Sequence, residues 1–393
     1  MTRHLPAALI LACSLVAMPA WATPGDIVSA ELERTMSPAN VDLFIATLYD
    51  GYDKPAAVCS VDVWAVKFES VYPDGEPAVA FAQVFIPRLD GEPRTTALYA
   101  FGPGSTGLTD ACRPSREHVA GIRWGLYRAH VLSHVGQGMI GVIPDYLGFG
   151  DPERDQYYMV AEAEASAMLH AIRAATLMAR RGGYAGIGTI KNFVAGFSQG
   201  GHAAFAAADW RTRLAPDVQL AGIIGYGPST DLVALFKEFP DVAPMALYTF
   251  RNLYGAGTVD PNLALASRFA PSLDIDVTRQ CVGGMQSYYP IDPTKLFNER
   301  FSSALLGNRL DDEFPGIARI LRLNSTGLTR HGVPALILQG TDDIVVSVAS
   351  QTAFAEASRR AGNAVELRVM QDVRHDTRQA GFYQAQEWMK SKL

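Results

Sequence analysis

A serine in a tight, glycine-rich turn is the strongest candidate for chemistry in this sequence. Residues 196–200 read Gly-Phe-Ser-Gln-Gly, so Ser198 lies between an apolar run at 190–195 and a helix-forming segment at 199–213. A strand, a sharp turn and a helix in this order lift a serine hydroxyl above a sheet, and the glycines let the helix approach the strand. The pattern predicts that Ser198 is a nucleophile for acyl transfer. The weaker interpretation is an ordinary glycine-rich turn.

A serine hydroxyl is a weak nucleophile at neutral pH, so a base must lie within hydrogen-bond reach of it. We expect His375 to be that base, because it follows the serine in chain order and lies in a loop beyond an apolar run at 365–370. His202 is four residues past Ser198 on the expected helix, one full turn from the hydroxyl. Packing or a hydrogen bond within the helix explains His202 better than base catalysis does.

The base must itself be oriented by a carboxylate, and three aspartates are candidates for that acid. An apolar run at 335–338 is followed by Asp342 and Asp343, in a loop expected at the carboxyl edge of a sheet. Asp231, just past an apolar run at 220–226, is a more remote candidate. Residue chemistry alone does not choose between Asp342 and Asp343.

Acyl transfer also requires backbone N–H donors for the negative charge that develops on the substrate oxygen. Gln199 directly follows the nucleophile at the start of a helix, so its N–H is expected to be one donor. The glycine-rich loop 101–107, after the third expected strand, is placed to supply the second donor. A flexible turn without a chemical role is the alternative for that loop.

Extended and helical segments alternate along most of the chain, which predicts an α/β fold, a mostly parallel sheet with helices on both faces. Eight strands are expected, at residues 58–69, 78–86, 96–101, 139–143, 190–195, 220–226, 335–338 and 365–370. Helices are expected at residues 119–135, 161–181, 199–213, 347–361 and 378–390. The first two strands should form an antiparallel hairpin around the Pro-Asp-Gly at 73–75.

Residues 229–330 do not follow this alternation, since they hold short helical patterns and no convincing strand. A structureless loop of that length is rare in a compact domain, so we predict a folded, mainly helical insertion in a core made of residues 23–228 and 331–393. Its aromatic residues either pack in a small core of the insertion or line an acyl pocket under a lid. These aromatic residues are Phe236, Phe239, Tyr248, Phe250 and Tyr254.

Residues 1–22 predict export of the chain. A positive charge near the start is followed by an apolar stretch at 5–17 and by Ala-Trp-Ala at 20–22, so a signal peptide should be cleaved before Thr23. A membrane anchor is a weaker alternative, because the apolar stretch is short and broken by Pro6 and Pro19. A lipoprotein attached through Cys13 is another, but it would shorten the apolar stretch and leave the Ala-Trp-Ala site unused. The mature protein is expected to be secreted or periplasmic.

Composition and charge exclude several other classes of protein. The chain is 48% hydrophobic and 19% charged, which allows a large core and argues against disorder. Its net charge is −6 without any run of lysine or arginine, so no nucleic-acid partner is expected. Zinc-binding clusters of cysteine or histidine are absent from the sequence, and the chemistry above requires no metal or organic cofactor. Nothing in the sequence indicates an obligate protein partner.

Three cysteines remain once the expected signal peptide is removed: Cys59, Cys112 and Cys281. In an oxidising compartment one disulfide and one free cysteine is the natural count. Spacing along the sequence does not choose the pair.

Three segments together resemble the secretory lipases and related exported esterases of the α/β-hydrolase superfamily. Residues 103–115, P-G-S-T-G-L-T-D-A-C-R-P-S, are similar to that family's H-G-T-T-G followed by C-A-P-S. Residues 144–150, P-D-Y-L-G-F-G, resemble its D-Y-x-G-x-G, and residues 196–202, G-F-S-Q-G-G-H, resemble its G-Y-S-Q-G-G-H. With the acid and histidine loops, these segments span most of the mature chain. One departure is Pro103, which stands where the family has histidine.

The resemblance implies an α/β-hydrolase fold, hydrolysis of carboxylic esters through an acyl-enzyme, and an insertion that caps the site. It selects Asp343 as the acid, because Gly-x-x-Asp before an apolar pair is the usual acid loop of this fold. By the same resemblance the N–H of Ser105 is the second oxyanion donor. It also implies that Cys112 is disulfide-bonded toward the insertion, where Cys281 lies.

The expected substrate is a small-molecule or lipid ester, and transient contact with a lipid interface fits such a substrate. The same set of serine, histidine and aspartate also serves amide and thioester hydrolases, which are the first alternative. A non-catalytic binding protein on the same scaffold is the second.

Overall fold

One nine-stranded sheet lies at the centre of the computed structural model, which describes residues 23–89, 97–117, 124–182 and 190–393. The strand order is β1-β2-β3-β5-β4-β6-β7-β8-β9. From β5 to β9 the neighbours pair in parallel, whereas β1, β2, β3 and β5 pair antiparallel. The strands are β1 (Ile27–Met36), β2 (Ser60–Val71), β3 (Pro77–Arg88), β4 (Ala97–Gly102), β5 (Ile140–Pro144), β6 (Lys191–Phe197), β7 (Leu220–Tyr226), β8 (Ala335–Gly340) and β9 (Val365–Met370).

The expected number of eight strands is wrong, because β1 was missed. This strand is the edge of the sheet and pairs only with β2, and Met36 is its single buried residue. A strand without a buried face has no reason to alternate apolar and polar residues, so its sequence carries no strand signal. The other eight strands lie where they were expected, and β2 and β3 form the antiparallel hairpin predicted around residues 73–75.

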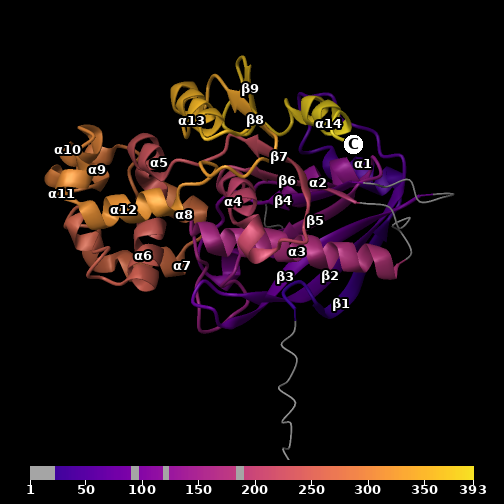
Figure 1. Cartoon of the computed structure of the whole chain (residues 1–393), viewed down its shortest axis with the longest axis horizontal. Helices are drawn as coiled ribbons and strands as arrows, with labels where there is room; N and C mark the ends of the chain where they lie inside the picture. Colours follow the sequence, from indigo (N-terminus) through magenta and orange to yellow (C-terminus); the bar gives the residue numbers. More distant parts are fainter. Residues whose placement is uncertain (1–22, 90–96, 118–123, 183–189) are drawn as a thin grey trace, which may run out of the picture.

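Helices cover both faces of the sheet, and each face has its own apolar core. Residues of α1 (Pro38–Ile45), α2 (Tyr127–Val135) and α14 (Phe382–Lys390) pack in one core cluster. Residues of α3 (Ala161–Arg181), α4 (Gln199–Leu214) and α13 (Val348–Arg360) pack in the other. In Figure 1, α3 crosses the front of the sheet. The prediction of a mostly parallel sheet with helices on both faces is confirmed.

Two helices begin later than the sequence suggested. For the helix expected at 119–135, α2 starts at Tyr127, and residues 119–123 lie outside the described part of the chain. The Glu117 carboxylate accepts the N–H groups of residues 124–128 and thereby caps this helix at its observed start. The helix expected at 378–390 starts at Phe382, because the side chain of Arg378 binds Asp376 in a preceding turn.

Residues between β7 and β8 form helices that gather beside the sheet, at the left of Figure 1. They contribute no strand to the sheet. The α-helices are α5 (Leu232–Glu238), α6 (Ala243–Tyr254), α7 (Leu273–Arg279), α8 (Val282–Tyr288), α9 (Pro293–Leu296), α10 (Glu299–Leu306), α11 (Leu310–Glu313) and α12 (Pro315–Asn324). We refer to residues 229–330 as the insertion.

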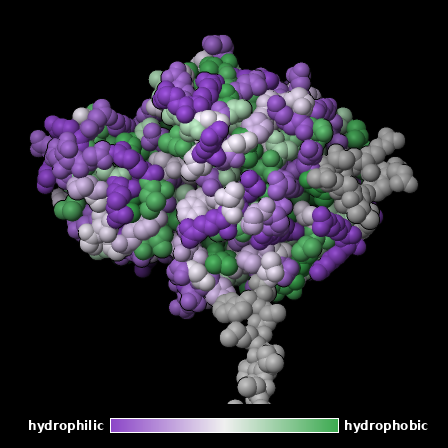
Figure 2. Space-filling view, viewed as in Figure 1, coloured by the Kyte–Doolittle hydropathy of each residue, from purple (hydrophilic) through white to green (hydrophobic). Residues whose placement is uncertain are grey.

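A disulfide between Cys112 and Cys281 ties the insertion to the loop after β4, which confirms the pairing implied by the family resemblance. Cys59 is buried and free. The predicted signal peptide, residues 1–22, lies outside the described residues. Within the described residues, no helix combines the length and apolar character needed to cross a bilayer. Hydrophobic residues are scattered among hydrophilic ones on the face shown in Figure 2.

Candidate active site

Ser198 stands at the sharp turn between β6 and α4, at the carboxyl edge of the sheet. Its backbone has φ 54° and ψ −115°, a conformation that is strained for a residue with a side chain. The flanking glycines are required by space: a Cβ on Gly196 would lie 1.9 Å from the Gly200 oxygen, and one on Gly200 would lie 1.7 Å from the Gly102 oxygen. The Ser198 N–H donates to the Tyr226 carbonyl over 3.1 Å, which fixes the turn to β7.

His375 lies in the loop after β9 and is paired with Asp343, which lies in the loop after β8. Its Nδ1 is 2.8 Å from Oδ2 of Asp343. Oδ1 of the same carboxylate accepts the N–H groups of Val345 and Val346 at 2.8 and 2.9 Å. Burial raises the pKa of Asp343, but His375 and these N–H groups lower it, and the net pKa lies below its usual value. The carboxylate is therefore held ionised and pointed at the imidazole.

The two other candidate acids lie elsewhere. Asp342 is exposed and accepts a hydrogen bond from the hydroxyl of Thr341. Asp231 caps α5, because its carboxylate accepts the N–H groups of Val233 and Ala234. Of the three aspartates, Asp343 alone contacts His375 in the structure.

The imidazole of His375 is held on several sides. Its ring packs against the ring of Phe197 with centroids 4.9 Å apart. On another side it lies against Gly227, where a Cβ would be 3.0 Å from Nδ1. Its Nε2 is buried and has no hydrogen-bond partner among the described residues. Ser198 and His375 line one cavity of about 210 Å³, so Nε2 is available for a proton from a group in that cavity.

Of the two residues expected to supply the oxyanion donors, Ser105 lines this cavity and Gln199 directly follows Ser198. Gln199 is the first residue of α4, so its N–H has no acceptor within the helix. Ser105 lines the cavity, and its hydroxyl shares a 2.7 Å hydrogen bond with Tyr158. The Tyr146 hydroxyl donates to the carbonyl of Pro103 over 2.7 Å, which holds the loop at the position where the family has histidine.

Asp145 fixes a neighbouring loop. Its buried carboxylate accepts the N–H and the hydroxyl of Ser115 at 2.8 and 2.6 Å. Burial raises the pKa of Asp145 to about 6. Its contacts bind one loop to another and lie outside the cavity lining.

Most of the cavity wall was not visible in the sequence. The aromatic residues of the insertion divide between the two expected roles: Phe239 lines the cavity, whereas Phe236 and Phe250 are fully buried in the core. Loops and helix ends supply the rest of the wall, and no periodic pattern marks such positions. These further lining residues are Trp124, Tyr127, Tyr158, Met159, Phe197, Ser229, Leu235, Val242, Val282, Gln286 and Val345.

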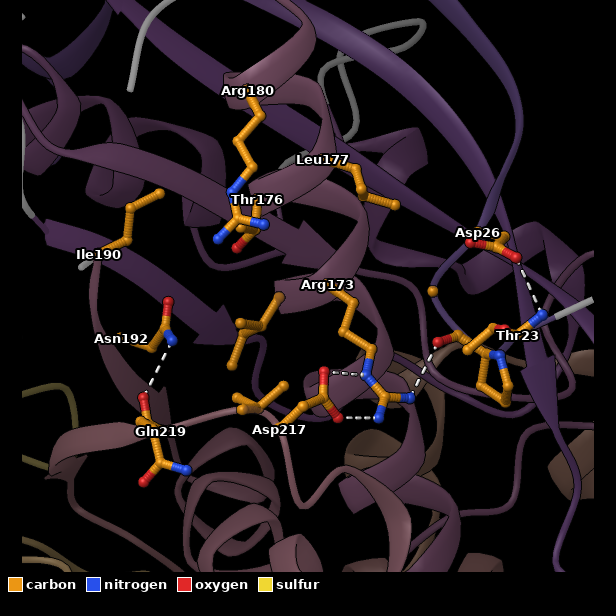
Figure 3. Close-up of a pocket in the computed structure, with 14 residues that line it drawn as sticks. Thr23, Asp26, Arg173, Thr176, Leu177, Arg180, Ile190, Asn192, Asp217 and Gln219 are labelled. Carbon is orange, nitrogen blue, oxygen red and sulfur yellow. Dashed lines mark hydrogen bonds and ion pairs between the residues drawn. The ribbon is translucent and has the colours of Figure 1, made fainter. Parts of the chain in front are cut away.

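A larger cavity of about 540 Å³ lies at the opposite edge of the sheet, where β6 and β7 begin (Figure 3). It is lined by residues 23–26, by the second half of α3 and by residues 217–219, and an Arg173–Asp217 ion pair closes one side. Among the described residues its lining contains neither histidine nor cysteine, and of its two carboxylates Asp217 is paired with Arg173. Within the described residues, no group of three or more His, Cys, Asp or Glu could hold a metal ion.

Comparisons with known proteins identify the family of this chain and proteins that share its fold. The model of the secretory lipase family matches residues 116–380. The ligand-bound rice cell wall degrading esterase LipA from Xanthomonas oryzae has a TM-score of 0.73 at 17% identity, over 94% of this chain and 97% of that one. A putative hydrolase from Legionella pneumophila has a TM-score of 0.72 at 19% identity, with 93% and 98% covered.

Candida antarctica lipase A in its closed state is also similar, with a TM-score of 0.64 at 16% identity over 94% of this chain and 82% of that one. At these identities the structures show a shared fold, which is the α/β-hydrolase fold. A comparison with curated protein sequences gave no match.

Proposed function

Because the chain belongs to the secretory lipase family and is a carboxylic ester hydrolase, we propose that it cleaves esters through Ser198, His375 and Asp343. His375 Nε2 removes the hydroxyl proton as Ser198 Oγ attacks the ester carbonyl. The tetrahedral oxygen binds the N–H groups of Gln199 and Ser105. His375 then gives the proton to the departing alcohol, which leaves the acyl group bonded to Ser198 Oγ. In the second half of the reaction His375 removes a proton from water, and the water attacks the acyl carbonyl. The bond to Ser198 Oγ breaks, His375 returns the proton to Oγ, and the acid is released.

One observation supports this proposal most strongly. A serine in a strained turn shares a cavity with a buried imidazole nitrogen that has no partner among the described residues, while the other ring nitrogen binds a carboxylate. The carboxylate holds the imidazole in the tautomer whose Nε2 can accept a proton. No metal or organic cofactor takes part in the proposed steps.

We further propose that the acyl group is short. The cavity of about 210 Å³ is smaller than the roughly 300–1,000 Å³ typical of pockets that hold drug-sized ligands. Most of its wall on the insertion side is apolar, formed by Leu235, Phe239, Val242 and Val282 beside the polar Ser229 and Gln286. A wall of this kind favours an alkyl group over a charged one. Small-molecule esters therefore fit this cavity better than long-chain lipid esters.

Export is part of the same proposal. The family is secretory, and residues 1–22 carry the features of a signal peptide. The Cys112–Cys281 disulfide also fits an oxidising compartment. Mass spectrometry of the mature protein, after expression of the full chain, should find Thr23 at the N-terminus in the periplasm or medium. Retention of residues 1–22 on the mature protein would contradict this.

Ester profiling tests the reaction and the substrate class together. We expect hydrolysis of p-nitrophenyl esters to be fastest at two to six acyl carbons and to fall at least about a thousandfold in Ser198→Ala. The matched control is Ser133→Ala, which removes a buried hydroxyl that donates to Ala129 within α2. Faster turnover of an aminoacyl amide or a thioester would replace the ester assignment.

A further inference from the structure

A buried glutamate and histidine join the nucleophile helix to two other parts of the molecule. Glu164 on α3 and His202 on α4 are both fully buried. His202 Nδ1 lies 2.6 Å from Oε2 of Glu164, and its Nε2 lies 2.5 Å from the carbonyl oxygen of Asn324, the last residue of α12. The ring therefore bridges α3 to the end of the insertion.

Both neighbours of this ring are hydrogen-bond acceptors. A backbone carbonyl oxygen can only accept, and so can an ionised carboxylate. A neutral imidazole has one N–H and could satisfy one of the two contacts, whereas an imidazolium satisfies both. With Glu164 ionised, the two contacts call for a doubly protonated His202 whose charge is neutralised by Glu164.

The charged groups around the ring favour its protonated form. Burial lowers the pKa of His202, but the charge and hydrogen bond of Glu164 and the hydrogen bond to Asn324 raise it above its ordinary value. Asp209, on the same helix, adds a smaller effect in the same direction. Tyr254 of α6 faces the side chain of Asn324 and hydrogen-bonds to it.

The other oxygen of Glu164 binds Met159 of the cavity wall and Gln199, whose N–H is the proposed oxyanion donor. Oε1 accepts the side-chain amide of Gln199 at 2.8 Å and the N–H of Met159 at 3.1 Å. Met159 lines the cavity and has a left-handed backbone with φ 55°, so it depends on such contacts. One carboxylate therefore holds His202, the residue after the nucleophile and a piece of the wall.

The end of the insertion is fastened around the same ring. The side-chain oxygen of Asn324 accepts the N–H of Ala161 at 3.1 Å, at the start of α3. The Thr326 hydroxyl donates to the His202 carbonyl over 3.1 Å, and its N–H donates to the Thr230 carbonyl. Thr230 and Thr326 lie near the two ends of the insertion, so both ends meet at His202.

We propose that Glu164 and an imidazolium at His202 are positioning residues that fasten the insertion to the nucleophile helix and orient Gln199 and Met159. The effect of this pair on turnover rests on the proposed function. The protonation state of His202 and the attachment of the insertion to α4 do not. When His202 loses a proton at alkaline pH, one ring nitrogen no longer carries a hydrogen and cannot bind the acceptor that it faces. The end of α12 is then released.

The protonation state is measured on the wild-type protein by ¹⁵N NMR of the histidine rings. His202→Gln identifies the signal, and where this variant does not fold, ring-to-backbone correlations within α4 identify it. We expect two N–H groups on His202 at pH 7 and a change to one N–H only at higher pH. A single N–H at pH 7 would overturn the proposal, whichever nitrogen carries it.

The fastening is measured by hydrogen exchange of residues 315–327. In His202→Gln and Glu164→Gln we expect exchange there to rise at least about tenfold. The matched control is His170→Gln, on the same helix α3, where the buried ring binds Ser70 away from the insertion. Equal exchange in His202→Gln and His170→Gln would contradict the proposal. Where the variants do not fold, exchange in the wild type must rise as His202 loses its proton, and constant exchange would contradict it.

Turnover separates this proposal from the proposed function. Misplacing Gln199 should lower kcat for a short ester by about ten- to a hundredfold in Glu164→Gln, while KM changes less, since the ester is not bound by Glu164. Unchanged kcat in a folded Glu164→Gln variant would remove the orienting role. A wild type that shows the imidazolium and the fastened insertion but no ester turnover would instead refute the proposed function alone.

Discussion

His375 Nδ1 lies 2.8 Å from Asp343 Oδ2, while the Nε2 of the same ring has no partner among the described residues. Two loops, after β8 and after β9, are thereby joined at the carboxyl edge of the sheet. The aspartate also accepts two backbone N–H groups and the side-chain amide of Gln339, so it cannot turn away from the ring. An imidazole held in this way faces the cavity that contains Ser198.

Asp343→Asn tests the contact between Asp343 and His375, and Asp342→Asn is the comparison. The amide cannot stabilise the imidazolium or select its tautomer, so kcat should fall by about 10⁴. Asp342→Asn changes an exposed side chain that does not contact His375, and we expect less than a threefold effect. Steady-state kinetics with one short ester decides between the two. A large loss in Asp342→Asn with normal Asp343→Asn would reverse the assignment.

Asp241 should make the protein less stable at alkaline pH. It lies in the turn η4 (Pro240–Val242), is buried, and has no hydrogen-bond partner for either carboxylate oxygen among the described residues. Burial raises its pKa from 3.8 to about 7. Between these values the unfolded chain is ionised and the folded chain is protonated, so the free energy of unfolding falls as pH rises.

Asp241→Asn removes that dependence. Urea unfolding should show the variant more stable than the wild type at pH 8 by about 4 kcal/mol, and nearly equal to it at pH 4. The exposed Asp342→Asn serves as the control with unchanged stability at both pH values. An Asp241→Asn variant that is less stable than the wild type at pH 8 would mean that the carboxylate has a partner.

Phe239 and Phe236 should respond differently to truncation. Phe239→Ala removes part of the cavity wall and enlarges the cavity, so the preferred acyl chain should lengthen by two or more carbons. Phe236 is fully buried and stacks on Phe297, so Phe236→Ala should cost about 3–5 kcal/mol of stability without a change in chain preference. Chain-length profiles and urea unfolding of both variants are the measurements. An unchanged profile in Phe239→Ala would place the acyl group elsewhere.

The Cys112–Cys281 disulfide should stabilise the whole chain by holding the insertion to the core. Replacing both cysteines by serine should cost about 2–5 kcal/mol of unfolding free energy. Reducing agent should lower the Tm of the wild type and leave that of the double variant unchanged. Cys59→Ser keeps the disulfide and should retain the response to reducing agent. A wild-type Tm that is insensitive to full reduction would contradict this role.

The sequence predicted the parallel part of the sheet well because its strands are buried and apolar, as in β6 and β8. It missed β1, whose exposed residues carry no pattern. The start of α2 was also not predicted, because Glu117 caps it from ten residues upstream of Tyr127. Signals of this kind come from tertiary contacts and not from local residue preference.

For the candidate site, motif and chain order alone predicted that Ser198 and His375 lie together, and both line one cavity in the structure. The choice between Asp342 and Asp343 needed the family resemblance, since both are aspartates in one loop. The bridge through Glu164 was not visible, because its partners lie 35 and 38 residues away along the chain. A buried glutamate in a helix has no sequence signal until its partners are known.

Labelling with a fluorophosphonate tests the central claim most directly, because this probe reacts only with an activated serine. We predict a single adduct, mapped by peptide mass spectrometry to Ser198, absent in Ser198→Ala and formed at least about a thousandfold more slowly in His375→Ala. An adduct on another serine, or equal labelling of the wild type and His375→Ala, would contradict the account.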